Sequence, residues 1–471
     1  MPFRPYGWIN CALILACCGP LSGTDTDSTA SGTESTGTSG DLTGTTVTPT
    51  TDPPTTTVNS TTITITDPTV TSDPTTDPTV TTVNPTTDPT LGTEGTVASD
   101  PTATSDNTST TADPSDSDSS STTGPVQTFS PLALEVQDFD GDGKHDLLVM
   151  GIDQDTQAVG RISLGAGDGT FMPEVDSGLI GASAFPVVGE LDGTPGIDVM
   201  VAQDGGGAEV FRWGGQLFTS WKLFDNANLP RTHVVADADK DGDDDIVWLW
   251  WTKNSLEFGL SIRPNGGGFF FAPVDTKVGA IADIGLAPGS LLVGRLNADA
   301  AADALVFEAD KPKGFLRMFG SDPGLFGQPK FLLPQLQPWV ASLGDFDEDG
   351  DLDILVLERS LSRLVVALGD GAGGFTIGPI VPVAGPFKPF TMTIADFNGD
   401  KHLDVAVIDD QTPELQIWSG KGNATLTGPV VTPLPSSAVR VIAAPLNGDT
   451  RADLVVATFA AGQVTVILSA P

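Results

Sequence analysis

The chain of 471 residues is poor in the residue types that most enzymes use. All three of its cysteines lie within the first 18 residues, so the rest of the chain can form no disulfide bond and no cysteine metal site. There is one tyrosine, and the three histidines, His145, His233 and His402, are far apart in the sequence. This shortage argues against most acid–base and nucleophilic machinery, and we expect the protein not to be an enzyme.

Positive charge is also scarce. The chain has 22 basic against 61 acidic residues, which gives a formal net charge of -39. Such a surface repels nucleic-acid phosphates and anionic lipid headgroups, so we expect neither as a partner. An acidic surface of this kind favours cations.

The first residues of the chain carry an export signal. A short basic start precedes an apolar run from Ile9 to Ala16, which is too short to span a bilayer and is typical of a signal peptide. "ILAC", ending at Cys17, resembles a bacterial lipoprotein signal, in which that cysteine is lipidated. The alternatives are lipidation of Cys18 and simple secretion. We therefore expect residues 1–17 to direct export to the outer membrane or cell surface as a lipoprotein, or to secretion.

Residues 18–123 form a low-complexity segment of Thr, Ser, Asp, Pro, Gly and Val. No aromatic residue occurs between Gly23 and Gln127, and there are too few apolar residues to offset the entropy of ordering. Recurrent Asp-Pro pairs and like charges favour an extended chain. We expect a disordered linker that holds a folded domain, residues 124–471, away from a surface.

That domain repeats one nine-residue motif seven times. "DFDGDGKHD" begins at Asp138, and related segments begin at 190, 237, 295, 345, 396 and 445, a spacing of 47 to 58 residues. Each motif lies between an apolar stretch and a strand-like run such as "IVWLWW" or "ILVLE", and a glycine-rich turn follows a further strand. This period and order predict an all-β fold of seven four-stranded antiparallel propeller blades. A stacked solenoid is the alternative. We expect residues 124–129 to supply the fourth strand of the last blade.

The segments "GGFTIGP", "IADFNGDKHLDVAVI" and "LQIWSGKGN" carry a family resemblance. They resemble the FG-GAP or VCBS repeats of integrin-α-like seven-bladed propellers, and the resemblance extends over residues 124–471. It implies an extracellular β-propeller whose acidic loops form calcium cages. The fold hosts many functions, so the resemblance names no single one.

The acidic loops have the spacing that calcium ligands require. Calcium takes six to eight hard oxygen ligands, which side chains at positions 1, 3, 5 and 9 and the carbonyl at position 7 can supply. We call the four most complete copies the intact loops. Their predicted metal-binding residues are Asp138, Asp140, Asp142, Lys144 and Asp146; Asp237, Asp239, Asp241, Asp243 and Asp245; Asp345, Asp347, Asp349, Asp351 and Asp353; and Asp396, Asn398, Asp400, His402 and Asp404.

A calcium loop of a helical hand is excluded. It needs a glutamate at position 12, where the intact loops have apolar residues inside strand-like runs. Position 9 should therefore begin a β-strand. We call the other three copies the degenerate loops. Arg295 and Pro445 replace the first carboxylate in two of them, which we expect to bind no ion, and the third, from Glu190, is a candidate weak site.

Three tryptophans in one strand-like run have two readings. Trp248, Trp250 and Trp251 could form a stacking platform for sugars, but packing between blades is the favoured interpretation. We expect His145 and His402 to be exposed in their loops and His233 to lie in a strand before a loop.

The sequence as a whole favours a monomeric, calcium-stabilised surface or secreted propeller for cell adhesion or for binding a protein or glycan ligand. A lectin is the first alternative. An enzyme is the second, and a convergent carboxylate, histidine and arginine on the propeller axis would revive it.

Overall fold

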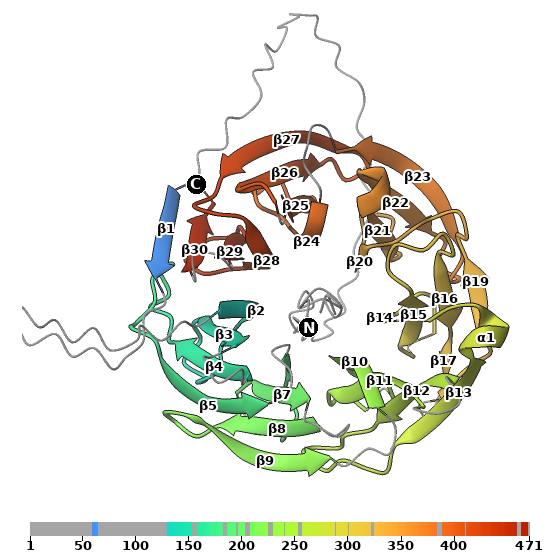
Figure 1. The fold of residues 1–471 in the computed structure, drawn as a ribbon, viewed down its shortest axis with the longest axis horizontal. Coiled ribbons are helices and arrows are strands. Elements are labelled where there is room, and N and C mark those ends of the chain that lie inside the picture. Colours follow the sequence, from blue (N-terminus) through green and yellow to red (C-terminus); the bar gives the residue numbers. More distant parts are fainter. Residues whose placement is uncertain are drawn as a thin grey trace, which may run out of the picture. The chain divides into compact units, whose positions relative to one another are not determined.

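The computed structural model describes residues 59–64 and 130–469, except for 153–157, 182–185, 195, 203–207, 225–228, 240, 253–256, 288, 300, 322–324, 384–388, 410 and 459–462. The backbone alone is described for residues 59–64. Seven four-stranded antiparallel sheets follow one another around a ring (Figure 1). The predicted all-β propeller of seven blades is confirmed.

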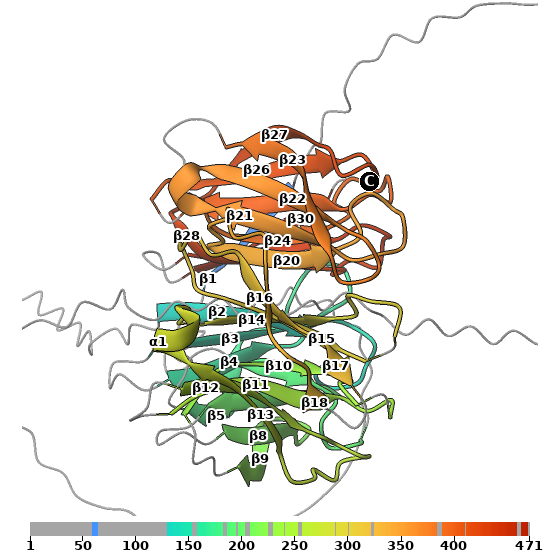
Figure 2. The same ribbon diagram turned by 90° about the vertical axis from the view of Figure 1, so that its right-hand side faces the viewer.

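In blades 1 to 6 the strands follow the chain from the ring axis outward. Blades 1 to 3 comprise β2 (Ser130–Gln137), β3 (Asp146–Ile152), β4 (Ala158–Ser163) and β5 (Val175–Gly181); β6 (Val187–Gly189), β7 (Asp198–Ala202), β8 (Ala208–Trp213) and β9 (Phe218–Phe224); and β10 (Leu229–Ala236), β11 (Asp245–Trp251), β12 (Glu257–Arg263) and β13 (Val274–Ala280). The short helix α1 (Ile281–Ile284) follows β13 and contacts it (Figure 2).

Blades 4 to 6 follow the same plan. They comprise β14 (Ser290–Gly294), β15 (Asp303–Phe307), β16 (Phe315–Met318) and β19 (Lys330–Leu332); β20 (Val340–Gly344), β21 (Asp353–Glu358), β22 (Arg363–Gly369) and β23 (Phe375–Pro382); and β24 (Pro389–Ala395), β25 (Asp404–Asp409), β26 (Glu414–Gly420) and β27 (Leu426–Pro433). A small hairpin, β17 (Gly320–Ser321) with β18 (Leu325–Phe326), lies within blade 4, and a 3₁₀ turn, Arg359–Leu361, joins β21 to β22.

The seventh blade is closed by a segment from far upstream. It comprises β28 (Ala438–Ala444), β29 (Asp453–Thr458) and β30 (Gln463–Leu468), and β1 (Asn59–Thr64) pairs with β30 as the outermost strand. The sequence analysis assigned this place to residues 124–129, which lie outside the described residues, and that assignment is wrong. The segment "NSTTIT" is rich in β-branched residues and lies in a proline-free stretch, so each of its residues keeps the amide that pairing requires.

The hydrophobic core is divided among the seams between blades. The described residues form seven buried apolar clusters, and each one draws residues from two neighbouring blades. The cluster that contains Val149 of blade 1 and Val455 of blade 7 closes the ring, which excludes the solenoid. Because both faces of a blade pack against neighbours, second strands such as β21 and β29 are buried along their whole length.

No helix among the described residues combines the length and the apolar character that crossing a membrane requires.

Candidate metal centre

Each acidic loop connects the first strand of its blade to the second. Position 9 begins the second strand in all seven blades, and in each it is paired with the residue just before position 1, as in Gln137 with Asp146. Position 12 of the intact loops lies inside β3, β11, β21 and β25. The loop is therefore the turn of a β-hairpin, and the exclusion of a helical hand is confirmed.

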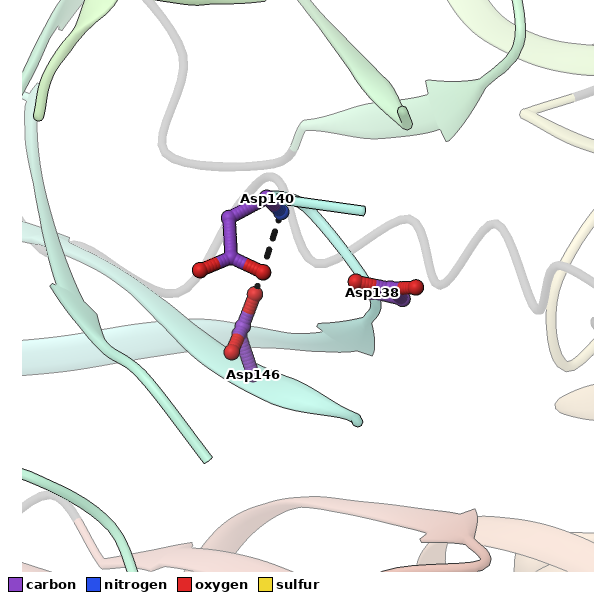
Figure 3. Close-up of side chains that lie close together, drawn as sticks. All are labelled: Asp138, Asp140 and Asp146. Carbon is purple, nitrogen blue, oxygen red and sulfur yellow. Dashed lines mark hydrogen bonds between the residues drawn. The ribbon is translucent and has the colours of Figure 1, made fainter. Parts of the chain in front are cut away.

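In three intact loops the carboxylates at positions 1, 3 and 9 converge. One carboxylate oxygen from each residue lies within 4.8 Å of the others, and Figure 3 shows the first of these groups. We call them the acidic triads; they consist of Asp138, Asp140 and Asp146; Asp237, Asp239 and Asp245; and Asp345, Asp347 and Asp353. Three carboxylates at this separation can hold a hard divalent cation.

Mutual repulsion is visible in the triads. The pKa of Asp347 is raised by desolvation and by the neighbouring carboxylates Asp349 and Asp345. The pKa of Asp239 is raised by desolvation and, next, by Asp241. A bound cation would remove this repulsion, so the donor set fits a metal ion.

Positions 5 and 7, also predicted as ligands, are not part of the triads. The carboxylate of Asp142 accepts hydrogen bonds from the amide of Lys144 at 2.9 Å and from its Nζ at 2.8 Å. This side-chain bond holds the pKa of Asp142 below its usual value. At position 7 in the next intact loop, Asp243 accepts a hydrogen bond from the amide of Gly267 at 2.7 Å.

Asp241, Asp349 and Asp400, at position 5 of the other intact loops, each accept a hydrogen bond from the amide at position 7. Their carboxylates stabilise the turn. Sequence spacing could not separate this use from metal binding.

The fourth intact loop differs from the other three. Its Asn398 replaces the second carboxylate, and the Nδ2 of this side chain lies 3.3 Å from the Oδ1 of Asp404. Lys401 stands where the others have glycine and adopts the same left-handed conformation, with φ of 71°. His402 pairs with Glu348 of the preceding blade's loop, which raises the pKa of His402.

Position 9 does more than complete a triad. In all seven loops its Oδ2 accepts a hydrogen bond from the amide of position 2, at 2.8–3.0 Å. In six loops its Oδ1 also accepts one from an amide at the end of the third strand or just after it, at 2.7–2.9 Å. We call this the aspartate clip. It fastens the acidic loop to the end of the third strand, and the spacing of the motif did not predict it.

The environment of the clip explains why its aspartates resist ionisation. They are Asp146, Asp198, Asp245, Asp303, Asp353, Asp404 and Asp453, and none is more than 3% exposed. Burial raises the pKa of Asp146 and Asp404 to about 6, and that of Asp198 and Asp245 to about 7. Hydrogen bonds from the backbone amides oppose this shift, since they favour the charged carboxylate.

The clip also explains a glycine at the end of the third strand. A Cβ on Gly420 would lie 2.1 Å from the carbonyl oxygen of Leu403, the residue that precedes the clip aspartate Asp404. Only glycine lets the two backbones approach so closely.

The degenerate loops keep the clip without the triad. Asp303 and Asp453 make both clip hydrogen bonds although Arg295 and Pro445 occupy position 1. In the loop from Glu190, the guanidinium of Arg212 lies 3.7 Å from the carboxylate of Asp192 and supplies a positive charge there. No acidic triad forms in these three loops among the residues that the structure describes.

Neighbouring blades meet at the acidic loops. The carbonyl at position 2 accepts a hydrogen bond from the glycine-rich turn of the next blade in three cases. These bonds run from the amide of Gly169 to Leu446 at 3.0 Å, from the amide of Ala424 to Phe346 at 2.7 Å, and from Asn265 Nδ2 to Leu191 at 3.2 Å. Of these three loops only the one from Asp345 has an acidic triad, so an ion bound there would also steady the seam between blades 5 and 6.

The strands nearest the axis hold part of the constellation that an enzyme would need. Glu135 on β2 and Arg440 on β28 are both buried, and Arg440 opposes the effect of burial, which raises the pKa of Glu135 to about 7. His233 on β10 is buried too, and burial alone lowers its pKa to about 4.

The tryptophans of β11 pack between blades. Trp248 and Trp250 are buried in the seam of blades 2 and 3, and Trp251 packs on the other face, against the cluster shared with blade 4. The prediction of inter-blade packing is confirmed, and no stacking platform is exposed there. His145 and His402 were expected to be exposed, but both are half-buried in their loops, and His233 lies in β10 before its loop, as expected.

Comparisons with solved structures find proteins of diverse activity. The chain is similar to an Agrocybe aegerita lectin that recognises non-reducing terminal N-acetylglucosamine, with 18% identity and a TM-score of 0.46 over 65% of this chain and 81% of that one. A Bacillus licheniformis rhamnogalacturonan lyase has 13% identity and a TM-score of 0.44 over 73% and 72%. A periplasmic gluconolactonase of Pseudomonas aeruginosa has 15% identity and a TM-score of 0.43 over 70% and 88%.

Comparisons of sequence are more specific. No curated protein matches the chain. The family model described as FG-GAP-like repeat matches residues 345–407 and 396–456, which include two intact loops and the whole degenerate loop from Pro445. The chain is therefore a seven-bladed β-propeller that carries FG-GAP-like repeats.

Proposed function

We propose that the chain is a non-catalytic, calcium-stabilised binding module that acts outside the cytoplasm. The acidic triads are the observation that carries this proposal, since three loops bring three carboxylates together at hairpin turns. Residues 1–17 would direct export, with Cys17 as the lipidated residue, and residues 18–123 would act as the spacer. All of residues 1–17 lie outside the described residues, so export is supported by the sequence alone.

Calcium suits these loops because all their side-chain ligands are hard oxygens. Positions 1, 3 and 9 would hold the ion, and the position-5 carboxylate and the position-7 carbonyl would complete the set. The fourth intact loop would use Asp396, Asn398, Asp400 and Asp404. The calcium affinity of extracellular modules is modest, with dissociation constants on the order of 10⁻⁴–10⁻³ M. Bound calcium would stabilise the folded state, because the unfolded chain has no such site.

The proposed role of calcium is structural, and the ligand would be a surface protein or glycan recognised by propeller loops. The scarcity of histidine, tyrosine and cysteine supports a binding role over a catalytic one. The burial of Trp248 and Trp250 removes the sequence feature that most favoured a lectin.

The test compares the wild type with a triple variant, Asp138→Asn, Asp237→Asn and Asp345→Asn. Titration calorimetry should show calcium binding to the wild type, and thermal unfolding should show that calcium raises its melting temperature. The triple variant should lose most of both effects. An identical melt with calcium and with a chelator would refute the metal proposal.

The binding role needs a separate measurement. Arrays of surface proteins and of glycans should show saturable binding that weakens when a chelator is added. Repeated catalytic conversion of a glycan or an ester would contradict a non-catalytic role if the triple variant retained it.

A further inference from the structure

The outer strand of blade 7 is attached in an unusual way. In the other six blades the outer strand follows the third strand after only four to eleven residues. β1 instead precedes all the other strands, and 65 residues separate Thr64 from the start of β2 at Ser130. The short connections of the other six blades oblige the outer strand to pair with its own blade. The connection that follows β1 is long enough to remove this constraint.

The edge that receives β1 is built without it. β30 pairs with β29 over five residues, and its Val464, Val466 and Ile467 are buried in seam clusters. β1 adds an antiparallel register of six residue pairs, from Asn59 with Leu468 to Thr64 with Gln463. Backbone pairing of this kind is the basis on which extended peptides bind to sheet edges.

The length of the connection sets how strongly β1 is held to its own blade. The composition of residues 65–129 predicts a flexible linker, and a flexible chain of 65 residues would have a root-mean-square span of roughly 44 Å. Its end would then have an effective concentration on the order of millimolar at the edge of β30. The same segment of another copy competes once the local concentration of protein reaches that range.

We propose that the free edge of β30 is a strand-acceptor site whose alternative occupant is residues 59–64 of a second copy, so that two copies exchange β1 reciprocally. Both edges are filled in such a dimer, and every backbone pair present in the monomer is kept. Exchange of an identical element between protomers is a low-cost route to dimers. This inference does not depend on calcium or on the proposed function.

The first test isolates the acceptor edge in the full chain. Thr62→Pro and Ile63→Pro together remove two successive amides, so one of them is a ladder donor whichever way the pair alternates. A labelled peptide of residues 58–67 should bind this donor variant at one to one and raise its melting temperature. It should bind the wild type at least about tenfold more weakly, because β1 already occupies the edge.

Two matched controls accompany this measurement. The peptide that carries the same two prolines should not bind, and the variant Thr81→Pro with Thr82→Pro should behave as the wild type. The proposal is wrong if the donor variant, shown by circular dichroism to be folded, fails to bind the unsubstituted peptide.

The second test asks whether a second copy is the occupant. The wild type should be monomeric at micromolar concentration by sedimentation velocity, and should form dimers after refolding at about millimolar concentration. The donor variant should remain monomeric under both conditions. Equal dimerisation of the donor variant would assign the dimer to another surface, and the absence of wild-type dimers would refute exchange between copies.

Discussion

The intact and degenerate loops share one hairpin and differ in one set of side chains. The loop from Asp345 and the loop from Pro445 both begin their second strand at position 9, and both fasten it with the aspartate clip. Only the first adds carboxylates at positions 1 and 3 that converge on the clip residue.

This difference separates two tasks that the motif combines. The clip joins the acidic loop to the end of the third strand, and it works in blades whose loops lack a triad. The triad adds a cation site to a hairpin that is already held together. Removal of the carboxylate at position 1 should therefore weaken metal binding alone, whereas removal of the carboxylate at position 9 should destabilise the blade.

The largest expected effect is the loss of a clip from a degenerate loop. Asp453→Ala leaves the buried amides of Leu446 and Ser469 without their acceptors, and should lower the free energy of unfolding by about 2–4 kcal/mol. Denaturant unfolding should show the same loss in calcium and in chelator. Thr450→Ala, at an exposed position of the same loop, is the control and should change stability little. A loss of stability that appears only in calcium would contradict the separate roles of the clip and the triad.

The next effect concerns position 1 of an intact loop. Asp345→Asn keeps an oxygen that can accept from the amide of Gly350, so stability in chelator should be nearly unchanged. In about 10 mM calcium the variant should be less stable than the wild type by about 1.4–2.7 kcal/mol, the linkage energy of one site with a dissociation constant of about 10⁻⁴–10⁻³ M. Asp299→Asn in a degenerate loop should show no such calcium dependence. Equal calcium responses of the two variants would argue against the triad.

The pH dependence follows from the raised pKa values of the clip aspartates. Burial raises the pKa of Asp146 to about 6 and that of Asp245 to about 7, above the unfolded value of about 3.9. Their protonated forms therefore favour the folded state below about pH 4, and this contribution is lost as the pH rises through 6 to 7 in chelator.

Calcium should reverse this trend, because it binds the ionised carboxylates. The calcium-induced rise in melting temperature should be largest above pH 7 and should disappear towards pH 4. Calorimetry at pH 6 in buffers of different ionisation enthalpy should show protons released on binding. A calcium response that is equal at pH 5 and pH 8 would count against the triads as the site.

The smallest expected effect is at position 6 of the fourth intact loop. Lys401 has a left-handed backbone with φ of 71°, whereas Gly143, Gly242 and Gly350 stand at this position in the others. Lys401→Gly should raise the free energy of unfolding by about 1 kcal/mol, since glycine adopts this conformation without the Cβ penalty. Thermal unfolding measures this change in stability, and Lys421→Gly is the control. A decrease for Lys401→Gly would mean that its side chain contributes more than its backbone costs.

Most of the fold could be predicted because its signals are local and repeated. The seven motifs fixed the number of blades, and apolar position 12 placed position 9 at the start of a strand, as Asp146 and Asp353 show. The burial of Trp248 and Trp250 followed from their alternation in β11. Each of these inferences needed only a few neighbouring residues.

The clip and the closing strand could not be predicted in the same way. The partner of Asp404 is the amide of Gly420, 16 residues away, and a backbone amide has no sequence signature. A signal did exist, because position 9 is the one position that is aspartate in all seven copies. β1 is held by backbone pairing and shares its composition with the segment around it, so nothing in "NSTTIT" identified β30 as its partner.

The sharing of every apolar cluster between two blades has a consequence for how the chain folds. A single blade has no core of its own, so it cannot be a stable folding unit by itself. The contacts between blades 1 and 7 join parts of the chain about 300 residues apart, and such distant contacts form slowly. A nascent chain with six blades would expose two unpaired apolar seam surfaces. It would avoid aggregation only if these surfaces did not contact other chains before the seventh blade emerged.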